Sequence, residues 1–382
     1  MNRVGLVVVA LLAACGDNLD GEEAIQNPAR DAYDQWIKIE PPGIVCGNGT
    51  QYKFWVNFSN KSDNLAVVFE PGGACWDYDS CAGRNGIRGA AHPDGLEDTD
   101  YDLASFISPF LSRVDDTSPS MNWNYVWVPY CTGDVHTGAT TVVYESGDEM
   151  DPDLEFHHDG HAAVQEVVKW IDANFTHVPK LLSTGCSAGG VGSIVNYRFL
   201  RNGVSAVEKA YLINDSGPIF PSSGFSKPLH EKIRSAWNLD SLTPLMPEGF
   251  TLDDMGTINT ALADEFPNDR LGTTYFRRDY NFSLYSYERF YNLDEDTDKE
   301  EILSHWNDDT LLLVDEFDTR DNLYYFIPYY RPINDSHCTT LFNFVDSDVE
   351  AQNMTLAQWV DDFVNDRPVS SYLEEPVPGE DD

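Results

Sequence analysis

A serine flanked by glycines is the residue in this sequence whose surroundings best suit nucleophilic chemistry. The run Gly185-Cys186-Ser187-Ala188-Gly189 fits the pattern G-x-S-x-G, and Gly190 follows it. In this pattern the serine stands at the tip of a sharp turn from a strand to a helix. The glycines let the two elements approach without clashing Cβ atoms. The sequence therefore predicts Ser187 as a nucleophile.

The segments around Ser187 have the patterns that such a turn requires. Residues 178–183 predict a short buried strand, and residues 191–200 predict the helix that follows. Elsewhere, residues 65–69 and 211–213 predict further strands, and residues 162–171 predict an amphipathic helix. Short apolar strands that alternate with amphipathic helices favour a three-layer α/β fold with a mostly parallel sheet.

Backbone donors for an oxyanion are expected upstream of the serine. The predicted strand 65–69 runs into Pro71-Gly72-Gly73-Ala74, and a Gly-Gly turn can present N–H groups into a cleft. The N–H of Ala188, the residue after the nucleophile, is the expected second donor. The alternative is that Gly72 and Gly73 form only a tight turn.

A serine nucleophile also needs a base and an acid that orients it. In the chain order Ser, Asp/Glu, His, both follow the serine. Residues 310–314 predict a buried strand, and carboxylates follow it from Asp315 to Asp321. His337 is the only histidine after His305, which singles it out as the base.

Several stretches resemble the pectinacetylesterase/Notum family of carboxylesterases. They occur in the family's order and span most of the chain: Cys46–Gly49, Glu70–Trp76, Pro129–Asp134, Gly185–Gly190, Phe317-Asp318 and His337-Cys338. The resemblance implies an α/β-hydrolase-like fold and a cofactor-independent serine esterase. It implies Ser187 as nucleophile, Asp318 as acid and His337 as base. It also implies an oxyanion hole at Gly72, Gly73, Ala74 and Ala188.

Two positions depart from the family pattern. Ala74 stands where the family has a third glycine or an aromatic residue, and Asp321 stands where it has a glutamine. These departures leave open the shape of the oxyanion hole and the way in which Asp318 is held. Asp315 and Asp215, which follows the predicted strand 211–213, remain alternatives for the acid.

The cysteines indicate an exported protein with disulfides. Of the seven cysteines, six remain once Cys15 is set aside, and an even number suits disulfide pairing. A Cys75–Cys81 pair resembles a bridge of the family. Cys131 and Cys186 each follow a predicted strand and would pair if those strands are neighbours, which leaves Cys46 with Cys338. No C-x-x-C occurs, and we expect no metal site.

The amino terminus resembles a bacterial lipoprotein signal. A basic start and an apolar run lead to Leu12-Ala13-Ala14-Cys15, which predicts lipidation of Cys15; an ordinary cleaved secretory signal is the alternative. We expect a signal peptide (1–14), a flexible tether (15–32), a catalytic domain (33–372) and an acidic disordered tail (373–382). The protein would then be lipid-anchored to the bacterial cell envelope, or secreted.

The stretch 218–307 is irregular and aromatic and lies between the predicted nucleophile and acid. It predicts either a cap over the pocket or extra helices packed at the sheet edge. Two clusters invite metal interpretations that we reject. His157, His158 and His161 suit a polar helix start, and residues 292–298 lack the glycine of a calcium loop.

The net charge limits the classes of partner that the protein can bind. With 24 Lys+Arg against 64 Asp+Glu the net charge is −40, which excludes nucleic acid and disfavours de-esterified pectin, a polyanion. We expect a monomer that acts on an acetylated carbohydrate or a small ester, with a lipid acyl group as the alternative substrate. A non-catalytic carbohydrate-binding lipoprotein, and a peptidase or lipase with the same triad, are rival interpretations.

Overall fold

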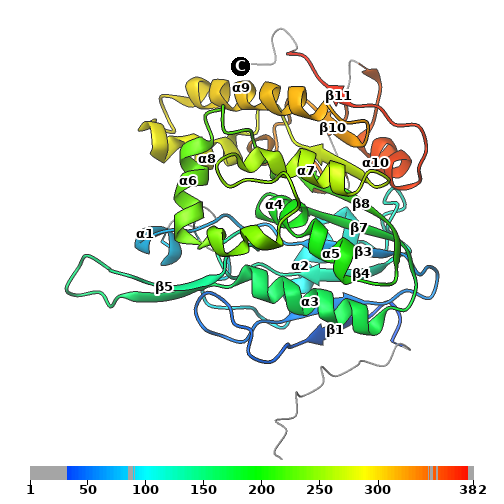
Figure 1. Cartoon of the computed structure of the whole chain (residues 1–382), viewed down its shortest axis with the longest axis horizontal. Coiled ribbons are helices and arrows are strands. Elements are labelled where there is room, and N and C mark those ends of the chain that lie inside the picture. Colours follow the sequence, from blue (N-terminus) through cyan, green and yellow to red (C-terminus); the bar gives the residue numbers. More distant parts are fainter. Residues whose placement is uncertain are drawn as a thin grey trace, which may run out of the picture.

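A nine-stranded sheet forms the centre of the computed structural model, which describes residues 32–376 except residues 85–88, 90, 343, 345–346 and 350–351 (Figure 1). The strand order is β1-β2-β4-β3-β7-β8-β9-β10-β11. β2 pairs antiparallel with β1 and β4, and all pairs from β4 to β11 are parallel. The strands are β1 (Trp36–Ile39), β2 (Phe54–Asn57), β3 (Leu65–Phe69), β4 (Asn124–Val128), β7 (Val178–Cys186), β8 (Val207–Asp215), β9 (Arg270–Thr274), β10 (Leu323–Ile327) and β11 (Tyr372–Leu373).

Helices accompany the sheet along the chain. The α-helices are α1 (Tyr78–Cys81), α2 (Asp100–Ile107), α3 (Gly160–Asn174), α4 (Ala188–Val195), α5 (Tyr197–Gly203), α6 (Lys227–Ala236), α7 (Ile258–Glu265), α8 (Tyr280–Tyr291), α9 (Lys299–Phe317) and α10 (Leu356–Val364). Short 3₁₀ helices are η2 (Pro109–Leu111), η3 (Leu239–Leu245), η4 (Met255–Thr257) and η5 (Asn334–Ser336). Among the described residues, no helix combines the length and the apolar character needed to cross a membrane.

Side-chain contacts place helices on both faces of the sheet. On one face, Trp170 of α3 packs edge-on against Phe54 of β2, and Ser183 of β7 donates to a carbonyl of α4. On the other face, Phe363 of α10 packs against Tyr211 of β8. A sheet covered on both faces has strands that are apolar throughout, as in β3, where every residue is buried. The predicted three-layer, mostly parallel α/β fold is confirmed.

The parallel arrangement brings the carboxyl ends of β3, β7, β8, β9 and β10 to one edge of the sheet. Ligands of open α/β sheets bind outside this edge, because the loops there converge without a neighbouring strand to block them. The predicted Gly72-Gly73 turn follows β3, and Ser187 follows β7. His337 follows β10 by a longer loop that includes η5. The fold therefore gathers these residues at a common edge.

Three expectations about elements are wrong. Residues 310–314 belong to helix α9, whose buried residues Ile302, Trp306, Asp309, Leu313 and Phe317 recur at helical spacing. The stretch 218–307 is not one insertion, because it contains β9, a strand of the central sheet. The predicted tail begins too early, since Leu373 lies in β11 and Glu374 is buried. The signal segment 1–14, the tether up to residue 31 and residues 377–382 lie outside the described residues.

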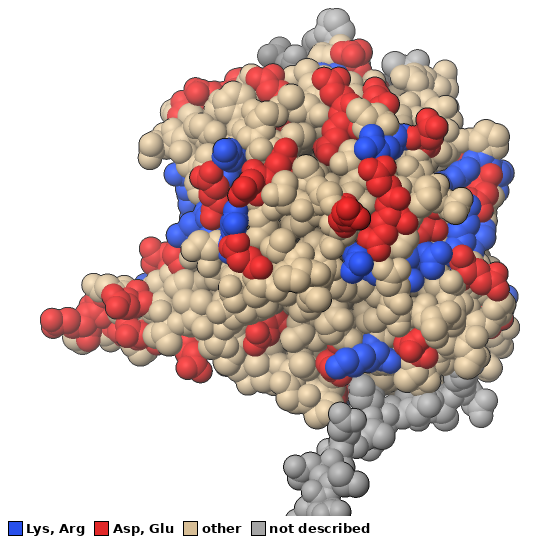
Figure 2. All heavy atoms as spheres, in the orientation of Figure 1, with Lys and Arg blue, Asp and Glu red and all other residues tan. Residues whose placement is uncertain are grey.

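A separate two-stranded hairpin of β5 (Thr140–Tyr144) and β6 (Leu154–His158) projects from the body (Figure 1). Its outer part carries the exposed acidic residues Glu145, Asp148, Glu149 and Asp153. Figure 2 shows acidic side chains spread over this face of the molecule and gathered at the hairpin tip. The excess of acidic residues is therefore distributed over the surface and is not confined to one patch.

Candidate active site

Ser187 occupies the sharp turn between β7 and α4 that the sequence predicts. Its backbone has φ 57° and ψ −123°, a conformation that a residue with a side chain rarely adopts. The Ser187 N–H donates to the carbonyl of Asp215 at 2.9 Å, so the neighbouring strand β8 holds the turn. Such strain at one serine is the hallmark of a nucleophile elbow.

The glycines around Ser187 are required by close backbone approach. A Cβ on Gly185 would lie 2.5 Å from the carbonyl oxygen of Phe69, and one on Gly189 would lie 2.1 Å from the same atom. A Cβ on Gly190 would lie 2.2 Å from the carbonyl oxygen of Asp215. Because real Cβ atoms do not come this close, helix α4 can cross β3 and β8 at this distance only with glycine at these positions.

His337 is paired with Asp279, a residue that the sequence analysis did not consider. Its Nδ1 lies 2.8 Å from Asp279 Oδ2, and both side chains are buried. Burial by itself lowers the pKa of His337, but the charge and hydrogen bond of Asp279 outweigh it, and the net pKa is raised. Burial raises the pKa of Asp279, and the interaction with His337 opposes that shift. With Nδ1–H donated to Asp279, Nε2 is the nitrogen left to accept a proton.

The prediction that Asp318 orients His337 is wrong. Asp318 is the exposed C-cap of α9, and its Oδ1 accepts a hydrogen bond from the Tyr325 hydroxyl at 3.3 Å. Asp315, also on α9, is exposed as well. The physical reason is that α9 ends at the surface, whereas Asp279 follows strand β9 at the edge where the other site residues gather.

Asp215, the other alternative, holds the loop that carries His337. It is fully buried and accepts hydrogen bonds from the N–H and hydroxyl of both Thr339 and Thr340, at 2.7–3.0 Å. Its Oδ1 also accepts from the Ser216 hydroxyl, and that hydroxyl oxygen in turn accepts from the N–H of Cys338. The end of β8 therefore fixes the chain directly after His337.

A disulfide joins the neighbours of Ser187 and His337. Cys186 is bonded to Cys338, and a ring nitrogen of His337 lies within 4.8 Å of Cys186 Sγ. Cys46 is bonded to Cys131, so the predicted pairs Cys131–Cys186 and Cys46–Cys338 are wrong. The expected Cys75–Cys81 bridge is confirmed. The strand-end argument failed because Cys186 faces the loop after β10, not the end of β4.

The loop after β3 has the left-handed backbone that two glycines permit, with φ 149° at Gly72 and 70° at Gly73. Gly73 and Ala188 line the same pocket as Ser187. Ala188 is the first residue of α4, so its N–H has no acceptor within the helix. Both positions line the pocket beside Ser187, and their role as oxyanion donors stays a prediction.

Ala74, the third expected position, is already engaged. Its N–H donates to the hydroxyl of Tyr285 at 2.7 Å, and the same hydroxyl donates to the Ala74 carbonyl at 3.0 Å. Tyr285 lies on α8, directly after the Asp279 loop. The helix that follows the acid therefore clamps the loop that would hold the oxyanion, and it occupies one of the predicted donors.

A mostly apolar pocket of about 100 Å³ opens beside Ser187. Its apolar lining comes from the loops after β3, β4 and β8, from η3 and η4, and from α4, α6 with its C-cap, and α8: Ala74, Trp76, Val135, Val191, Val195, Ile219, Phe220, Leu229, Ile233, Trp237, Leu239, Met255 and Phe282. A second apolar cavity of about 70 Å³ shares Thr137, Val195, Ile219, Leu239 and Met255 with it. The segment between β8 and β9 thus supplies much of the pocket lining beside Ser187. That the segment acts as a cap stays a prediction.

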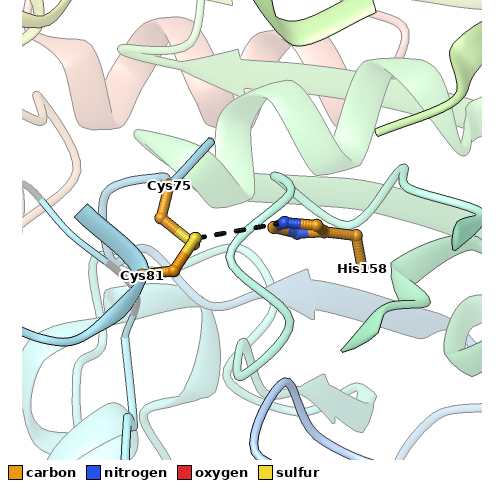
Figure 3. A group of neighbouring side chains, drawn as sticks. All are labelled: Cys75, Cys81 and His158. Atoms are coloured by element: carbon orange, nitrogen blue, oxygen red, sulfur yellow. Dashed lines mark hydrogen bonds between the residues drawn. A yellow bond between two sulfur atoms is a disulfide. The ribbon is translucent and has the colours of Figure 1, made fainter. Parts of the chain in front are cut away.

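The histidines of the rejected metal cluster lie on two elements. His157 and His158 belong to strand β6 and not to a helix start, and His161 lies on α3. His158 is buried against the Cys75–Cys81 disulfide, with Nε2 4.0 Å from Cys81 Sγ (Figure 3). Its Nδ1 donates to the Thr132 carbonyl and its Nε2 accepts from the Tyr144 hydroxyl. Burial lowers the pKa of His158 to about 4, so this group braces the oxyanion loop as a neutral ring.

Comparison with known proteins decides the family. A model of the pectinacetylesterase family matches residues 35–253, more than half of the chain. The chain belongs to the pectinacetylesterase family. The match ends before Asp279 and His337, so it covers the elbow and the oxyanion loop and not the acid and base.

Curated relatives and solved structures agree with this assignment. The palmitoleoyl-protein carboxylesterase Notum of Drosophila melanogaster is 26% identical over 222 residues, which are 54% of this chain and 31% of that protein. Pectin acetylesterase 4 of Arabidopsis thaliana is 22% identical over 191 residues, 48% of this chain and 42% of that protein. The match thus spans about a third of the Notum relative. The structure of the Wnt deacylase Notum from Drosophila superposes with a TM-score of 0.59 at 14% identity, covering 90% of this chain and 97% of that one. The α/β-hydrolase-like fold is therefore shared.

Proposed function

We propose that this protein hydrolyses carboxylic esters by acyl transfer to Ser187. The observation that carries the proposal is the Nδ1–Asp279 hydrogen bond of His337 at 2.8 Å, in a loop tied by the Cys186–Cys338 disulfide to the strained Ser187 turn. Nucleophile, base and acid then follow the chain order Ser, Asp, His.

In the proposed reaction His337 Nε2 takes the proton of Ser187 Oγ as the oxygen attacks the ester carbonyl. The carbonyl oxygen becomes an oxyanion, which the N–H groups of Gly73 and Ala188 stabilise. His337 then gives the proton to the departing alcohol, and an acyl-enzyme remains. A water molecule, deprotonated by His337, releases the acid. Asp279 keeps the ring oriented and stabilises its protonated form.

The pocket supports an acyl group longer than acetyl. Its walls beside Ser187 are apolar and aromatic, and a second apolar cavity lies behind shared residues. An acetyl group would leave most of this space without contacts, whereas a longer chain would bury apolar surface in it. The sequence favours an acetyl ester as substrate, whereas the pocket favours the alternative, a longer acyl group. Removal of acetyl from a neutral polysaccharide is the second candidate, supported by the pectin acetylesterase relatives.

The proposal extends to the surroundings of the enzyme. Disulfides join Cys46 to Cys131, Cys75 to Cys81 and Cys186 to Cys338, which favours export into an oxidising compartment. We include lipidation of Cys15, attachment to the cell envelope and a monomeric state as parts of the same proposal. Mass spectrometry of the membrane fraction tests the first two of these.

The experiment is hydrolysis of p-nitrophenyl esters from acetyl to palmitoyl by the purified protein and by Ser187→Ala. The exposed Ser223→Ala serves as the matched control. Activity that rises with chain length and disappears in Ser187→Ala supports a long-chain deacylase. Activity confined to acetyl supports the second candidate. Equal rates for the wild type and Ser187→Ala would remove Ser187 from the reaction.

A further inference from the structure

The first turn of helix α6 and its N-cap contribute two polar side chains to the mostly apolar wall of the pocket. Ser226 and His230 both line it, and the N–H of His230 donates to the carbonyl of Ser226. Both are buried, with exposed fractions of 1% and 9%. Their neighbours on the same wall, Leu229 and Ile233, are apolar.

The ring of His230 carries a buried nitrogen that the protein leaves unsatisfied. Its Nδ1 has no hydrogen-bond partner among the described residues. Buried polar atoms are nearly always paired in folded proteins, so each exception calls for an explanation. Burial lowers the pKa of His230 to about 4, and at neutral pH the ring offers one donor and one acceptor nitrogen.

The helix that carries His230 is firmly held. At its start, the N–H groups of Phe225 and Ser226 donate to the buried carboxylate of Asp309, at 2.6 and 2.9 Å. The same carboxylate accepts from the Tyr287 hydroxyl of α8. A polar group on such an element keeps a fixed position in the pocket, which is the requirement for selective recognition.

His230 is distinct from the proposed catalytic histidine. His337 has a carboxylate partner, and Asp279 raises its pKa. No carboxylate bonds to His230 among the described residues, and burial dominates its pKa. His230 lines the pocket, and neither of its ring nitrogens has a hydrogen bond to another described residue. A neutral imidazole in this position suits the binding of a hydroxyl group.

We propose that His230 binds a hydroxyl carried by the acyl group of the substrate, away from the ester carbonyl. This rests on the proposed function and narrows its substrate class to esters of hydroxylated acyl groups. Two sources share this chemistry. One is a hydroxylated fatty acyl chain, and the other is a hydroxycinnamoyl group, for which Trp76, Trp237 and Phe220 supply aromatic walls.

The test compares matched p-nitrophenyl esters that differ only by the hydroxyl. The pairs are decanoate with decanoates hydroxylated at the middle or the end of the chain, and cinnamate with its para-hydroxy derivative. We expect the wild type to hydrolyse one hydroxylated ester with a kcat/KM about tenfold or more above that of its plain partner. The plain ester lacks the hydroxyl, so the ring of His230 stays without a hydrogen-bond partner when that ester is bound. The pair that shows the larger ratio identifies the source.

Variants sharpen the test. His230→Phe should bring the ratio to within about twofold of unity by accepting the plain ester and losing the hydroxylated one, and His230→Gln should retain part of the preference. Leu229→Ile, which alters the same wall without a polar group, should keep the wild-type ratio. If His230→Phe does not fold, inhibition of the wild type by the free hydroxylated and plain acids gives the same comparison.

Failure of this inference can be distinguished from failure of the proposed esterase function. Hydrolysis of plain and hydroxylated esters at equal rates, with no change in His230→Phe, overturns the inference and leaves the esterase standing. Absence of hydrolysis for every ester overturns both.

Discussion

The loop after β9 and the end of helix α9 each present an aspartate, and their surroundings differ in every respect that matters for catalysis. Asp279 follows a central strand, is fully buried and bonds to His337. Asp318 ends a helix, is exposed and bonds only weakly to a tyrosine hydroxyl. The same residue type is therefore a candidate acid in one place and a surface cap in the other.

What separates them is the element that precedes each one. A parallel strand delivers the next few residues to the edge of the sheet where other strand ends gather. A helix packed outside the sheet delivers its last residue to solvent. Burial then makes the charge of Asp279 effective on His337, since a pair out of water is screened far less than a surface pair.

The largest expected effect tests this contrast directly. Asp279→Asn should lower kcat by about 10³–10⁴-fold, because the ring of His337 loses both its tautomer control and its counter-charge. The matched variant Asp318→Asn should stay within about twofold of the wild type. Steady-state kinetics on the preferred ester measure both. A large loss in Asp318→Asn with an active Asp279→Asn would reverse the assignment.

A smaller effect is expected where a carboxylate acts on the loop and not on the ring. Asp215→Asn replaces one of the two acceptor oxygens by an NH₂ donor, so the N–H and hydroxyl groups of either Thr339 or Thr340 lose their acceptor and the segment after His337 is held less firmly. We expect a loss of about 10–100-fold in kcat with little change in KM, since misplacement of a catalytic group affects the transition state most. The exposed Asp315→Asn is the control. A higher KM with an unchanged kcat would show that Asp215 shapes the pocket instead.

The Tyr285 hydroxyl should matter less, because it bonds to the backbone of the loop after β3, at Ala74, and not to the serine or the histidine. Tyr285→Phe removes both bonds to Ala74 and should lower kcat by about 3–10-fold as the loop loosens. Burst kinetics that separate acylation from product release locate the loss. A faster variant would mean that the hydroxyl blocks the third oxyanion donor rather than bracing the loop.

The pH profile gives the finest distinction. In the proposed reaction His337 takes a proton, which it can do only when neutral, and its pKa is raised above the ordinary 6.5. The rate kcat/KM should therefore fall as the pH is lowered through a value above 6.5. In Asp279→Asn the raising charge is gone while burial remains, so the residual activity should fall at a lower pH than in the wild type. Asp318→Asn should leave the acidic limb where it is.

Much of the candidate site could be predicted because several of its residues belong to short, recognisable sequence motifs. The elbow is recognisable because Gly185, Ser187 and Gly189 stand within five residues, although the contacts that require these glycines come from Phe69 of β3. The two-glycine turn at 72 and 73 follows a strongly apolar strand. His337 was found by elimination, since no other histidine follows His305. The fold class followed from the alternation of strands and helices.

Asp279 could not be predicted as the candidate acid because the strand before it, β9, lacks the apolar sequence typical of a buried strand. β9 reads Arg-Leu-Gly-Thr-Thr, with one strongly apolar residue, and its glycine faces Trp359 and Phe363 from α10. The packing that makes it a strand comes from the end of the chain. By contrast, residues 311–314 are continuously apolar, which makes the stretch 310–314 resemble a strand, but buried residues also recur before and after it at helical spacing. Tyr285 carried no local signal, because its partner Ala74 lies 211 residues away in the chain.

The bond between Cys186 and Cys338 has a consequence for where the protein can work. Ser187 directly follows Cys186, and His337 directly precedes Cys338. One disulfide therefore joins the neighbours of two residues that are far apart in the chain. Before that bond forms, only packing and hydrogen bonds such as those of Asp215 hold the two segments together. Without the disulfide we expect Ser187 and His337 to be held less firmly relative to each other. The proposed activity should therefore require an oxidising environment, and a mild reductant applied to the purified protein should lower the activity reversibly.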